Sequence, residues 1–337
     1  MQMKPFLKRL ALLCVAVTSS LAMMTGCASP SSESPSSGAA ETTAATAAPE
    51  SSDATGATVT VQDVKGDVEI PAEPKRVIDL SGNSDVLHIL GYSVIGTANT
   101  DAYDHTRLPS FLEDVLADAK ILGFSYQDTM DIENILPLEP DLIIISTRQE
   151  KMYEQLKGIA PTVMIELAQI DWKEDLLTMA RIFDKETLAQ AWLDDYLAKA
   201  AAAGEKVRAQ NGEDTTYFSF LASGGQLYVF DEAGFGSILY GEMGLAKPEG
   251  MPVQENVSLP VIGYEGLAAI DADYVIVVAT EEDMANLREN PIWNKLRAVT
   301  EGHVVALPSS PYFNQTYSSI GRELLFDEIP GWLEKAK

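Results

Sequence analysis

Two copies of one sequence pattern constrain the fold of this chain. The first copy is Glu133-NILPLEP-Asp141 followed by LIIIS, and the second is Glu265-GLAAIDA-Asp273 followed by YVIVV. In both copies a glutamate precedes an aspartate by eight positions (141 − 133 and 273 − 265), and an apolar run typical of a buried strand follows. A repeated pattern indicates a repeated structural unit. We therefore expect two similar α/β lobes, each containing one helix-turn-strand unit.

The stretch between the two copies predicts one long helix. Residues 185–210 are rich in Ala, Leu, Glu and Lys, which are strong helix formers. Leu188, Trp192 and Tyr196 recur at helical spacing and predict an apolar stripe. Gly204 is the weak point, because glycine costs about 1 kcal/mol relative to alanine in a helix. Such a helix spans about 39 Å, and we expect it to join the lobes as a rigid strut.

The first 57 residues do not read as part of a fold. Residues 1–26 combine Lys4, Lys8 and Arg9 with a short apolar run, which is typical of an export signal. The signal ends in Met-Thr-Gly-Cys27, which resembles a bacterial lipobox and predicts lipidation of Cys27. Residues 27–57 are mostly Ser, Ala, Thr, Pro and Glu, and they predict a disordered tether. We therefore expect a lipid-anchored protein on the outer face of the cytoplasmic membrane.

Charge and cysteine content narrow the class of partner. Without the signal, the chain carries 24 − 3 = 21 basic and 50 acidic residues, a net charge of −29. Such an acidic surface argues against nucleic acid as a partner and against peripheral binding to anionic lipid membranes. The cysteines are Cys14, in the signal, and Cys27, so the folded part has no disulfide.

Strand-like runs alternate with helical runs in the first lobe, residues 58–184, and the pattern returns in the second lobe, residues 211–337. This alternation predicts a parallel sheet in the first lobe and two doubly wound α/β lobes in all. Ligands of such sheets bind beyond the carboxyl ends of the strands. Residues expected there, or in the facing aromatic segments, are Asn83, Tyr126, Arg148, Trp172, Phe235, Tyr312 and Tyr317.

Arg148 directly follows an apolar strand run. Its guanidinium could pair with an anion or stack on an aromatic group at the mouth of a cleft. A solvated surface arginine is the alternative.

Motifs for catalysis and bare metal binding are missing from the sequence. The glycine-rich stretches fit neither a nucleotide-binding loop nor G-x-S-x-G. His88, expected in the core, His105, expected near the cleft, and His303, expected at the surface, are too dispersed to suggest a zinc site. Haem stays open, because an axial ligand could come from His105, Met130, Tyr312 or Tyr317. A surface lipoprotein enzyme and a lipoprotein that only binds other proteins are the alternatives from different classes.

In order and spacing, six segments resemble the iron-siderophore, haem and cobalamin class of ABC-transporter substrate-binding proteins. They begin at Asp63, Glu133, Leu156, Trp172, Glu265 and Pro291, and the resemblance covers residues 58–337. It implies a monomer without a cofactor that captures a ferric siderophore between its lobes and delivers it to an ABC permease. It also implies that Glu133 and Glu265 pair with arginines of the permease.

The segment from Pro140 to Thr162 is similar to members that bind ferric catecholates, in which the arginine matching Arg148 contacts the ligand. Those members carry further arginines in the second lobe, where this chain has Ala233-Gly234-Phe235 and Ala279-Thr280-Glu281. A ferric catecholate is strongly anionic, and one arginine compensates only a small part of that charge. A hydroxamate or mixed ferric siderophore, haem or cobalamin therefore stays open as the ligand.

Overall fold

Five parallel strands form the sheet of the first lobe in the computed structural model, which describes residues 57–168 and 170–336. Their order is β5-β4-β3-β6-β7, with every neighbouring pair parallel. The strands are β3 (Val77–Asp79), β4 (Val94–Thr97), β5 (Lys120–Ile121), β6 (Leu142–Ser146) and β7 (Thr162–Ile165). The first strand of this sheet, β3, is central, so the chain winds outward in both directions and leaves a switch point between β3 and β6.

The sheet of the second lobe repeats this strand order as β10-β9-β8-β11-β12. Its strands are β8 (Tyr217–Ser223), β9 (Gln226–Val229), β10 (Val261–Ile262), β11 (Tyr274–Ala279) and β12 (Val304–Pro308). This sheet is not parallel throughout, because β9 runs antiparallel to both β8 and β10. Gly224 and Gly225, with φ of 58° and 78°, make the tight turn that sends β9 back along β8.

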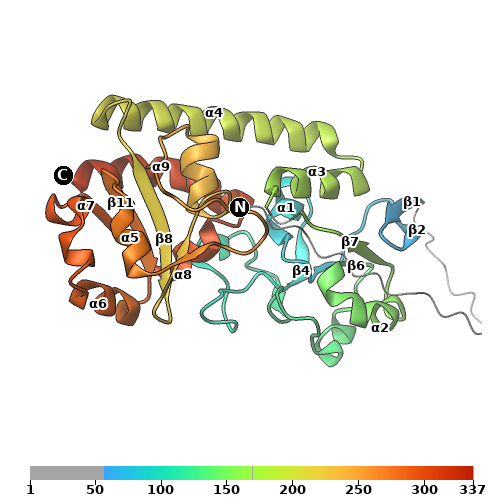
Figure 1. Cartoon of the computed structure of the whole chain (residues 1–337). Coiled ribbons are helices and arrows are strands. Elements are labelled where there is room, and N and C mark those ends of the chain that lie inside the picture. The colour runs from blue at the N-terminus through green and yellow to red at the C-terminus, as the bar shows by residue number, and fades with distance from the viewer. Residues whose placement is uncertain (1–56, 169, 337) are drawn as a thin grey trace, which may run out of the picture. The chain divides into compact units, whose positions relative to one another are not determined.

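Helices surround both sheets (Figure 1). The first lobe begins with a hairpin of β1 (Thr58–Asp63) and β2 (Gly66–Pro71), and it contains α1 (Ser84–Ile89), α2 (Tyr153–Lys157) and α3 (Trp172–Ile182). Its 3₁₀ turns are η1 (Ser110–Leu112), η2 (Ile132–Asn134), η3 (Leu136–Leu138) and η4 (Thr147–Met152). The second lobe contains η5 (Ser237–Glu242, π-helical), α5 (Tyr264–Ala269), α6 (Glu281–Glu289), η6 (Trp293–Lys295), α7 (Arg297–Thr300), α8 (Ser309–Gln315) and α9 (Ser319–Lys335). None of the helices in the described part is long and apolar enough to cross a membrane.

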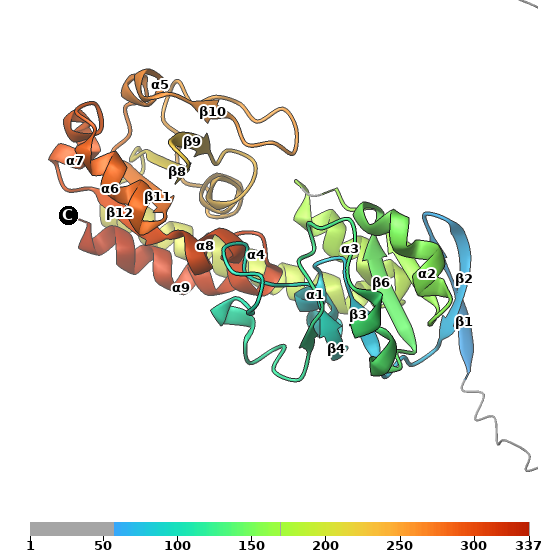
Figure 2. The same ribbon diagram turned by 90° about the horizontal axis from the view of Figure 1, so that it is seen from below.

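The predicted long helix is α4 (Glu186–Asn211), which runs along both lobes (Figure 1). It packs against α3 of the first lobe and against α9 and η5 of the second (Figure 2). The buried side of α4 is shifted relative to the expected stripe, because Tyr196 is fully buried whereas Leu188 is 44% exposed. Most of the buried residues of α4 are Ala or Gly. The buried residues are Ala189, Leu193, Tyr196, Ala200, Ala203, Gly204 and Val207.

The aspartate of the repeated pattern has the same structural role in both lobes. Asp141, just before β6, accepts hydrogen bonds from the backbone amides of Lys75 and Arg76 at 2.7 and 2.8 Å, where the chain enters β3. Asp273, just before β11, accepts from the backbone amide and hydroxyl of Thr216 at 2.8 and 2.7 Å, where the chain enters β8. Backbone groups at strand entrances have no ladder partner, so each aspartate satisfies donors that the sheet leaves open.

The glutamate part of the pattern differs between the lobes. Glu265 lies in the first turn of the α-helix α5, as expected. Glu133 lies in the 3₁₀ turn η2, and a second 3₁₀ turn containing Pro137 follows. Proline cannot donate the hydrogen bond that an α-helix would need here, so the segment forms two short turns. Both glutamates are exposed.

Candidate functional site

A cavity of about 160 Å³ lies at the carboxyl ends of the first lobe's strands and is closed by the second lobe. The first lobe contributes the loops after β3, β4, β5 and β6 and the start of α3. The second lobe contributes residues 233–237 and the α8–α9 junction. All of these segments belong to one compact unit of the chain. The switch point predicted from strand order is therefore where the cavity lies.

Asp79 fixes the loop after β3. Its carboxylate is fully buried and accepts hydrogen bonds from the Ser81 amide and hydroxyl at 3.0 and 2.6 Å, the Asn83 amide at 2.9 Å and the Ser84 hydroxyl at 2.7 Å. Burial raises the pKa of Asp79, and these donors oppose that shift. A buried carboxylate with this many partners rigidifies its surroundings, so Asn83 is held at the cavity wall.

Gln149 ties the next two loops together. Its side chain is fully buried. Its amide oxygen accepts from the Ser146 amide and hydroxyl at 3.0 and 2.8 Å, and its nitrogen donates to the carbonyls of Ser125 and Gln127 at 2.7 and 2.9 Å. Tyr126 stands between those two carbonyls in the chain. Gln149 thereby holds the Tyr126 loop beside the Arg148 turn.

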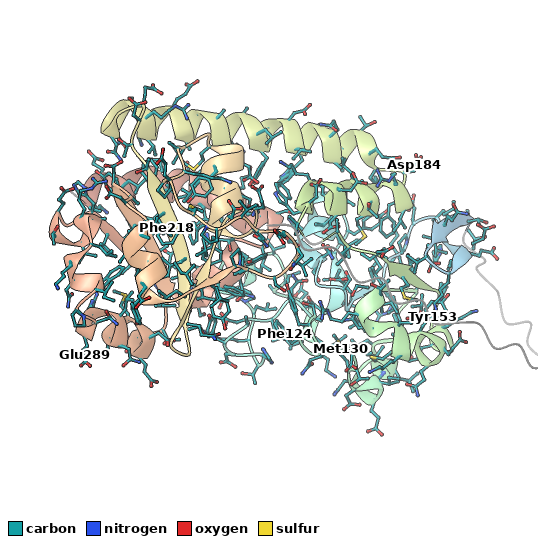
Figure 3. All side chains as sticks on the ribbon, viewed as in Figure 1. Phe124, Met130, Tyr153, Asp184, Phe218 and Glu289 are labelled. Carbon is teal, nitrogen blue, oxygen red and sulfur yellow. The ribbon has the colours of Figure 1, made fainter. Side chains whose placement is uncertain are left out.

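Arg148 lies over the ring of Tyr126, with 4.8 Å between the guanidinium carbon and the ring centroid. The stack continues from Tyr126 to Phe124 at 5.4 Å and from Phe124 to His105 at 4.0 Å between ring centroids. Phe124 is labelled in Figure 3. Arg148 is exposed, and within the described residues no carboxylate lies within ion-pair distance of it. The arrangement holds an uncompensated cation on an aromatic platform, which suits a ligand with acceptor oxygens.

The second lobe faces this platform with its own aromatic pair. Phe313 and Tyr317 line the cavity with ring centroids 5.2 Å apart. Tyr103 of the first lobe meets Phe313 edge-on at 6.1 Å. The surrounding protein raises the pKa of Tyr126 and of Tyr317 by desolvation, so both hydroxyls stay protonated near neutral pH. Both walls therefore offer aromatic faces and neutral hydrogen-bond donors.

Arg322 is a cation of the cavity wall that the sequence reasoning missed. It lies in the first turn of α9 and is 3% exposed. Its guanidinium carbon lies 4.9 Å from the centroid of the Trp172 ring, and Trp172 also lines the cavity. A cation in the first turn of a helix opposes the helix dipole, and that unfavourable placement is the signal that could have marked it.

Hydrogen bonds join the lobes on two sides of the cavity. Asp85 of α1, fully enclosed, accepts from the Ser318 hydroxyl and the Ser319 amide at the start of α9, both at 2.7 Å. Asn314 of α8 accepts from the Ala102 amide at 3.0 Å and donates to the Thr100 carbonyl at 3.2 Å. Burial raises the pKa of Asp85, and its hydrogen bonds oppose that shift.

Residues 81–311 match the family of periplasmic binding proteins. The chain belongs to that family. It is 30% identical over 281 residues to the iron(3+)-hydroxamate-binding protein FhuD of Bacillus subtilis (strain 168), covering 80% of this chain and 86% of that one.

Two further comparisons agree with this assignment. The probable siderophore-binding lipoprotein YfiY of Bacillus subtilis (strain 168) is 26% identical over 69% of this chain and 75% of its own length. The structure of unliganded FhuD2 from Staphylococcus aureus superposes with a TM-score of 0.68 at 22% identity, covering 83% of this chain and 99% of that one.

Five of the predicted ligand-binding residues of this periplasmic binding protein line the cavity, and two do not. Those that line it are Asn83, Tyr126, Arg148, Trp172 and Tyr317. The prediction for Phe235 is wrong, because Phe235 is fully buried in the core and packs edge-on against Phe230 and Trp332. The prediction for Tyr312 is also wrong, because its ring packs against Trp332 and its hydroxyl donates a hydrogen bond to the Glu328 carboxylate at 3.2 Å. Their neighbours Ala233, Gly234 and Phe313 line the cavity instead.

The candidate metal ligands do not gather. Within residues 57–168 and 170–336, no group of three or more His, Cys, Asp or Glu could hold a metal ion. Of the four residues kept open for haem, only Tyr317 lines the cavity. His88 is exposed, which corrects its expected place in the core, and His303 is partly buried and stacks on Tyr274 with centroids 4.5 Å apart. The export signal, Cys27 and the tether up to residue 56 lie outside the described residues.

Proposed function

We propose that this protein captures a ferric siderophore in the interlobe cavity and delivers it to an ABC permease. The class of ligand that the cavity supports best is a ferric complex of low net charge, such as a hydroxamate. Its 30% identical relative is an iron(3+)-hydroxamate-binding protein, which supports the same chemistry. Capture proceeds without turnover, so the role is not enzymatic.

The observation that carries this proposal is the charge of the cavity wall. The charged side chains that line it are two acids, Asp85 and Asp175, and two bases, Arg148 and Arg322. Arg322 pairs with Glu242, with 3.2 Å between nitrogen and oxygen. Arg148 is therefore the one lining cation without an ion-pair partner among the described residues. A strongly anionic ferric catecholate needs more positive charge than this, whereas hydroxamate groups balance the charge of Fe³⁺ within the ligand itself.

The size of the cavity implies movement during binding. Its volume of about 160 Å³ is below the roughly 300–1,000 Å³ of small-molecule sites. A ferric siderophore therefore enters only when the lobes part. Because α4 packs on both lobes, we expect opening to be a small hinge motion.

Delivery requires an anchored protein and a docking surface. Lipidation of Cys27 would hold the monomeric protein at the outer face of the cytoplasmic membrane, within reach of the permease. Glu133 and Glu265 are exposed, one on each lobe, and are proposed to pair with arginines of the permease.

A titration of intrinsic fluorescence tests the ligand class. The protein would start at position 27 with Cys27→Ser to prevent lipidation, and Trp172 at the cavity wall would report binding. The panel is ferric hydroxamate, ferric catecholate, ferric citrate, haemin and cobalamin. We expect saturable quenching by ferric hydroxamate that weakens about 10- to 100-fold in Arg148→Ala, because a charged hydrogen bond contributes about 1.5–3 kcal/mol.

Arg288→Ala is the matched control, because Arg288 is an exposed arginine in the last turn of α6 and should leave the affinity unchanged. Binding of haemin or cobalamin alone would replace the proposed ligand class. Binding of none of the five would contradict the siderophore role.

A further inference from the structure

We infer that Glu242 sets the charge selectivity of the cavity by neutralising Arg322. Glu242 does not line the cavity, and it acts through the arginine that does. The inference rests on the proposed function, because it concerns which ferric complexes the cavity accepts. It predicts that the ratio of affinities for neutral and anionic ligands depends on a residue outside the cavity wall.

Arg322 is built into the wall with spare hydrogen-bonding capacity. One terminal nitrogen donates to the Thr316 carbonyl at 2.6 Å, and the other donates to the Ser237 hydroxyl and to Glu242 at 3.2 Å. Its Nε is buried and has no partner within the described part of the chain. A buried donor without a partner is costly, so the protein alone does not satisfy Arg322 fully.

Glu242 is held in place by three elements. Its carboxylate accepts from the Trp172 indole of α3 at 2.9 Å, from the Tyr196 hydroxyl of α4 and from Arg322 of α9. The side chains of Arg322 and Glu242 are 3% and 1% exposed. The two opposite charges lie only 3.2 Å apart, so they largely cancel as seen from the cavity.

Removing one member of the pair would leave the other charge uncompensated beside the cavity. At the effective dielectric constant of protein interiors, a unit charge several ångströms from an anionic ligand changes its affinity by about 10- to 100-fold. A neutral ferric complex would feel far less of this charge. The two single variants should therefore shift the selectivity in opposite directions.

A purely structural role for Glu242 makes a different prediction. Glu242 connects α3, α4 and α9, so its loss could loosen the site. Loosening lowers the affinity for neutral and anionic ligands alike and leaves their ratio unchanged. The ratio of the two affinities therefore distinguishes an effect of the Glu242 charge from a purely structural role of Glu242.

The test measures Kd for a neutral ferric trihydroxamate and for anionic ferric citrate by fluorescence quenching, in the protein with Cys27→Ser. Relative to the trihydroxamate, Glu242→Gln should bind ferric citrate about 10- to 100-fold better and Arg322→Gln about 10- to 100-fold worse. The double variant should return the ratio to that of the parent protein. Tyr196→Phe removes a hydrogen bond to Glu242 but keeps its charge, so it should not change the ratio.

Equal ratios in the parent protein and the two single variants would overturn the inference. Should Glu242→Gln fail to fold, as judged by its melting transition, comparison of Arg322→Gln with the double variant still decides. Without a charge effect of Glu242, the double variant would keep the ratio of Arg322→Gln, whereas the inference predicts that it returns to the ratio of the parent protein. A parent protein that binds neither ferric complex would instead overturn the proposed function. A parent that binds the trihydroxamate while the ratios stay fixed would overturn only the role of Glu242.

Discussion

At the scale of single residues, buried polar side chains behind the cavity wall determine the site as much as the residues that line it. Asp79 holds the loop that carries Asn83, and Gln149 holds the loop that carries Tyr126. Each is fully buried and each has several hydrogen-bond partners. Because an unsatisfied buried polar group is costly, such a network permits few alternative loop conformations. The platform of Tyr126 and Arg148 is therefore prepared before any ligand arrives.

Gln149→Leu tests this preparation. The replacement has a similar size but leaves the Ser125 and Gln127 carbonyls without their donor. The buried Ser146 amide also loses its acceptor, and a buried group left unpaired costs about 1–3 kcal/mol, so the free energy of unfolding should fall by at least that much. Urea denaturation measures the loss. Ligand affinity should fall as well, because the loop carrying Tyr126 is no longer tied to the turn that carries Arg148.

Gln155→Leu is the matched control. Gln155 is an exposed glutamine on α2, six positions along the chain. Exposed positions of this kind usually change stability by less than about 0.5 kcal/mol. Equal stability and affinity in both variants would show that Gln149 does not organise the loops.

The sequence predicted residues that follow strands more reliably than aromatic residues in loops. Asn83, Tyr126 and Arg148 follow parallel strands, whose carboxyl ends must meet at one edge of the sheet. Phe235 and Tyr312 were chosen for their rings, but a ring serves a core as well as a ligand wall. Nothing local in the sequence says which way such a side chain faces. Arg322 was missed because its partners, Glu242 and Thr316, are set by tertiary packing.

At the scale of elements, composition and repetition were enough to predict which helices and strands form, but not how they pack. The bounds of α4 follow from its helix formers, and the repeated pattern predicted two similar lobes, whose sheets share one strand order in the structure. The direction of β9 depends on the tight turn at Gly224 and Gly225. The buried side of α4 depends on what covers it, namely α3, α9 and η5.

Gly204→Ala tests this close packing. Gly204 was expected to be a weak point of the helix, yet a Cβ there would lie 1.9 Å from the backbone oxygen of Met243. Backbone cannot move aside as a flexible side chain can, so the overpacking cost of about 1–3 kcal/mol should exceed the gain in helix propensity of about 1 kcal/mol. We expect a lower melting temperature by differential scanning calorimetry.

Gly331→Ala, in α9, supplies the comparison. A Cβ at Gly331 would meet nothing within 4 Å, so only the propensity term acts there. This substitution should leave stability unchanged or raise it by up to about 1 kcal/mol. If Gly204→Ala stabilised the protein as much as Gly331→Ala, the contact between α4 and η5 would be looser than the structure shows.

At the scale of the whole molecule, the two lobes are joined at three places around the cavity. The bonds of Asp85 to the start of α9, of Asn314 to the loop after β4, and of Trp172 to Glu242 all cross from one lobe to the other. The helix α4 spans the same division on one side. A ligand that parts the lobes must break some of these bonds and then replace them with its own contacts. Closure on a ligand is therefore the state in which both lobes present a fixed outer surface.

Such a fixed surface is what a permease could recognise, and Glu133 and Glu265 provide a charge on each lobe. Both side chains are exposed, and neither has a hydrogen bond to its carboxylate among those of the described residues. Replacing both by alanine should leave the affinity for the ferric siderophore unchanged, because neither residue lines the cavity. Uptake of the radiolabelled iron complex by cells should stop, because the complementary charges that orient docking are gone.

Glu154→Ala with Glu289→Ala removes the same amount of charge from two other exposed positions, one in each lobe, and should leave uptake intact. Glu289 is labelled in Figure 3. Normal uptake in the Glu133 and Glu265 double variant would place the docking surface elsewhere. Loss of uptake in both double variants would mean that the overall negative charge, and not its position on the two lobes, governs the encounter. Loss of uptake in the Glu133 and Glu265 double variant alone would assign these two glutamates to delivery. It would also explain why each lobe has an exposed glutamate at the start of its repeated pattern.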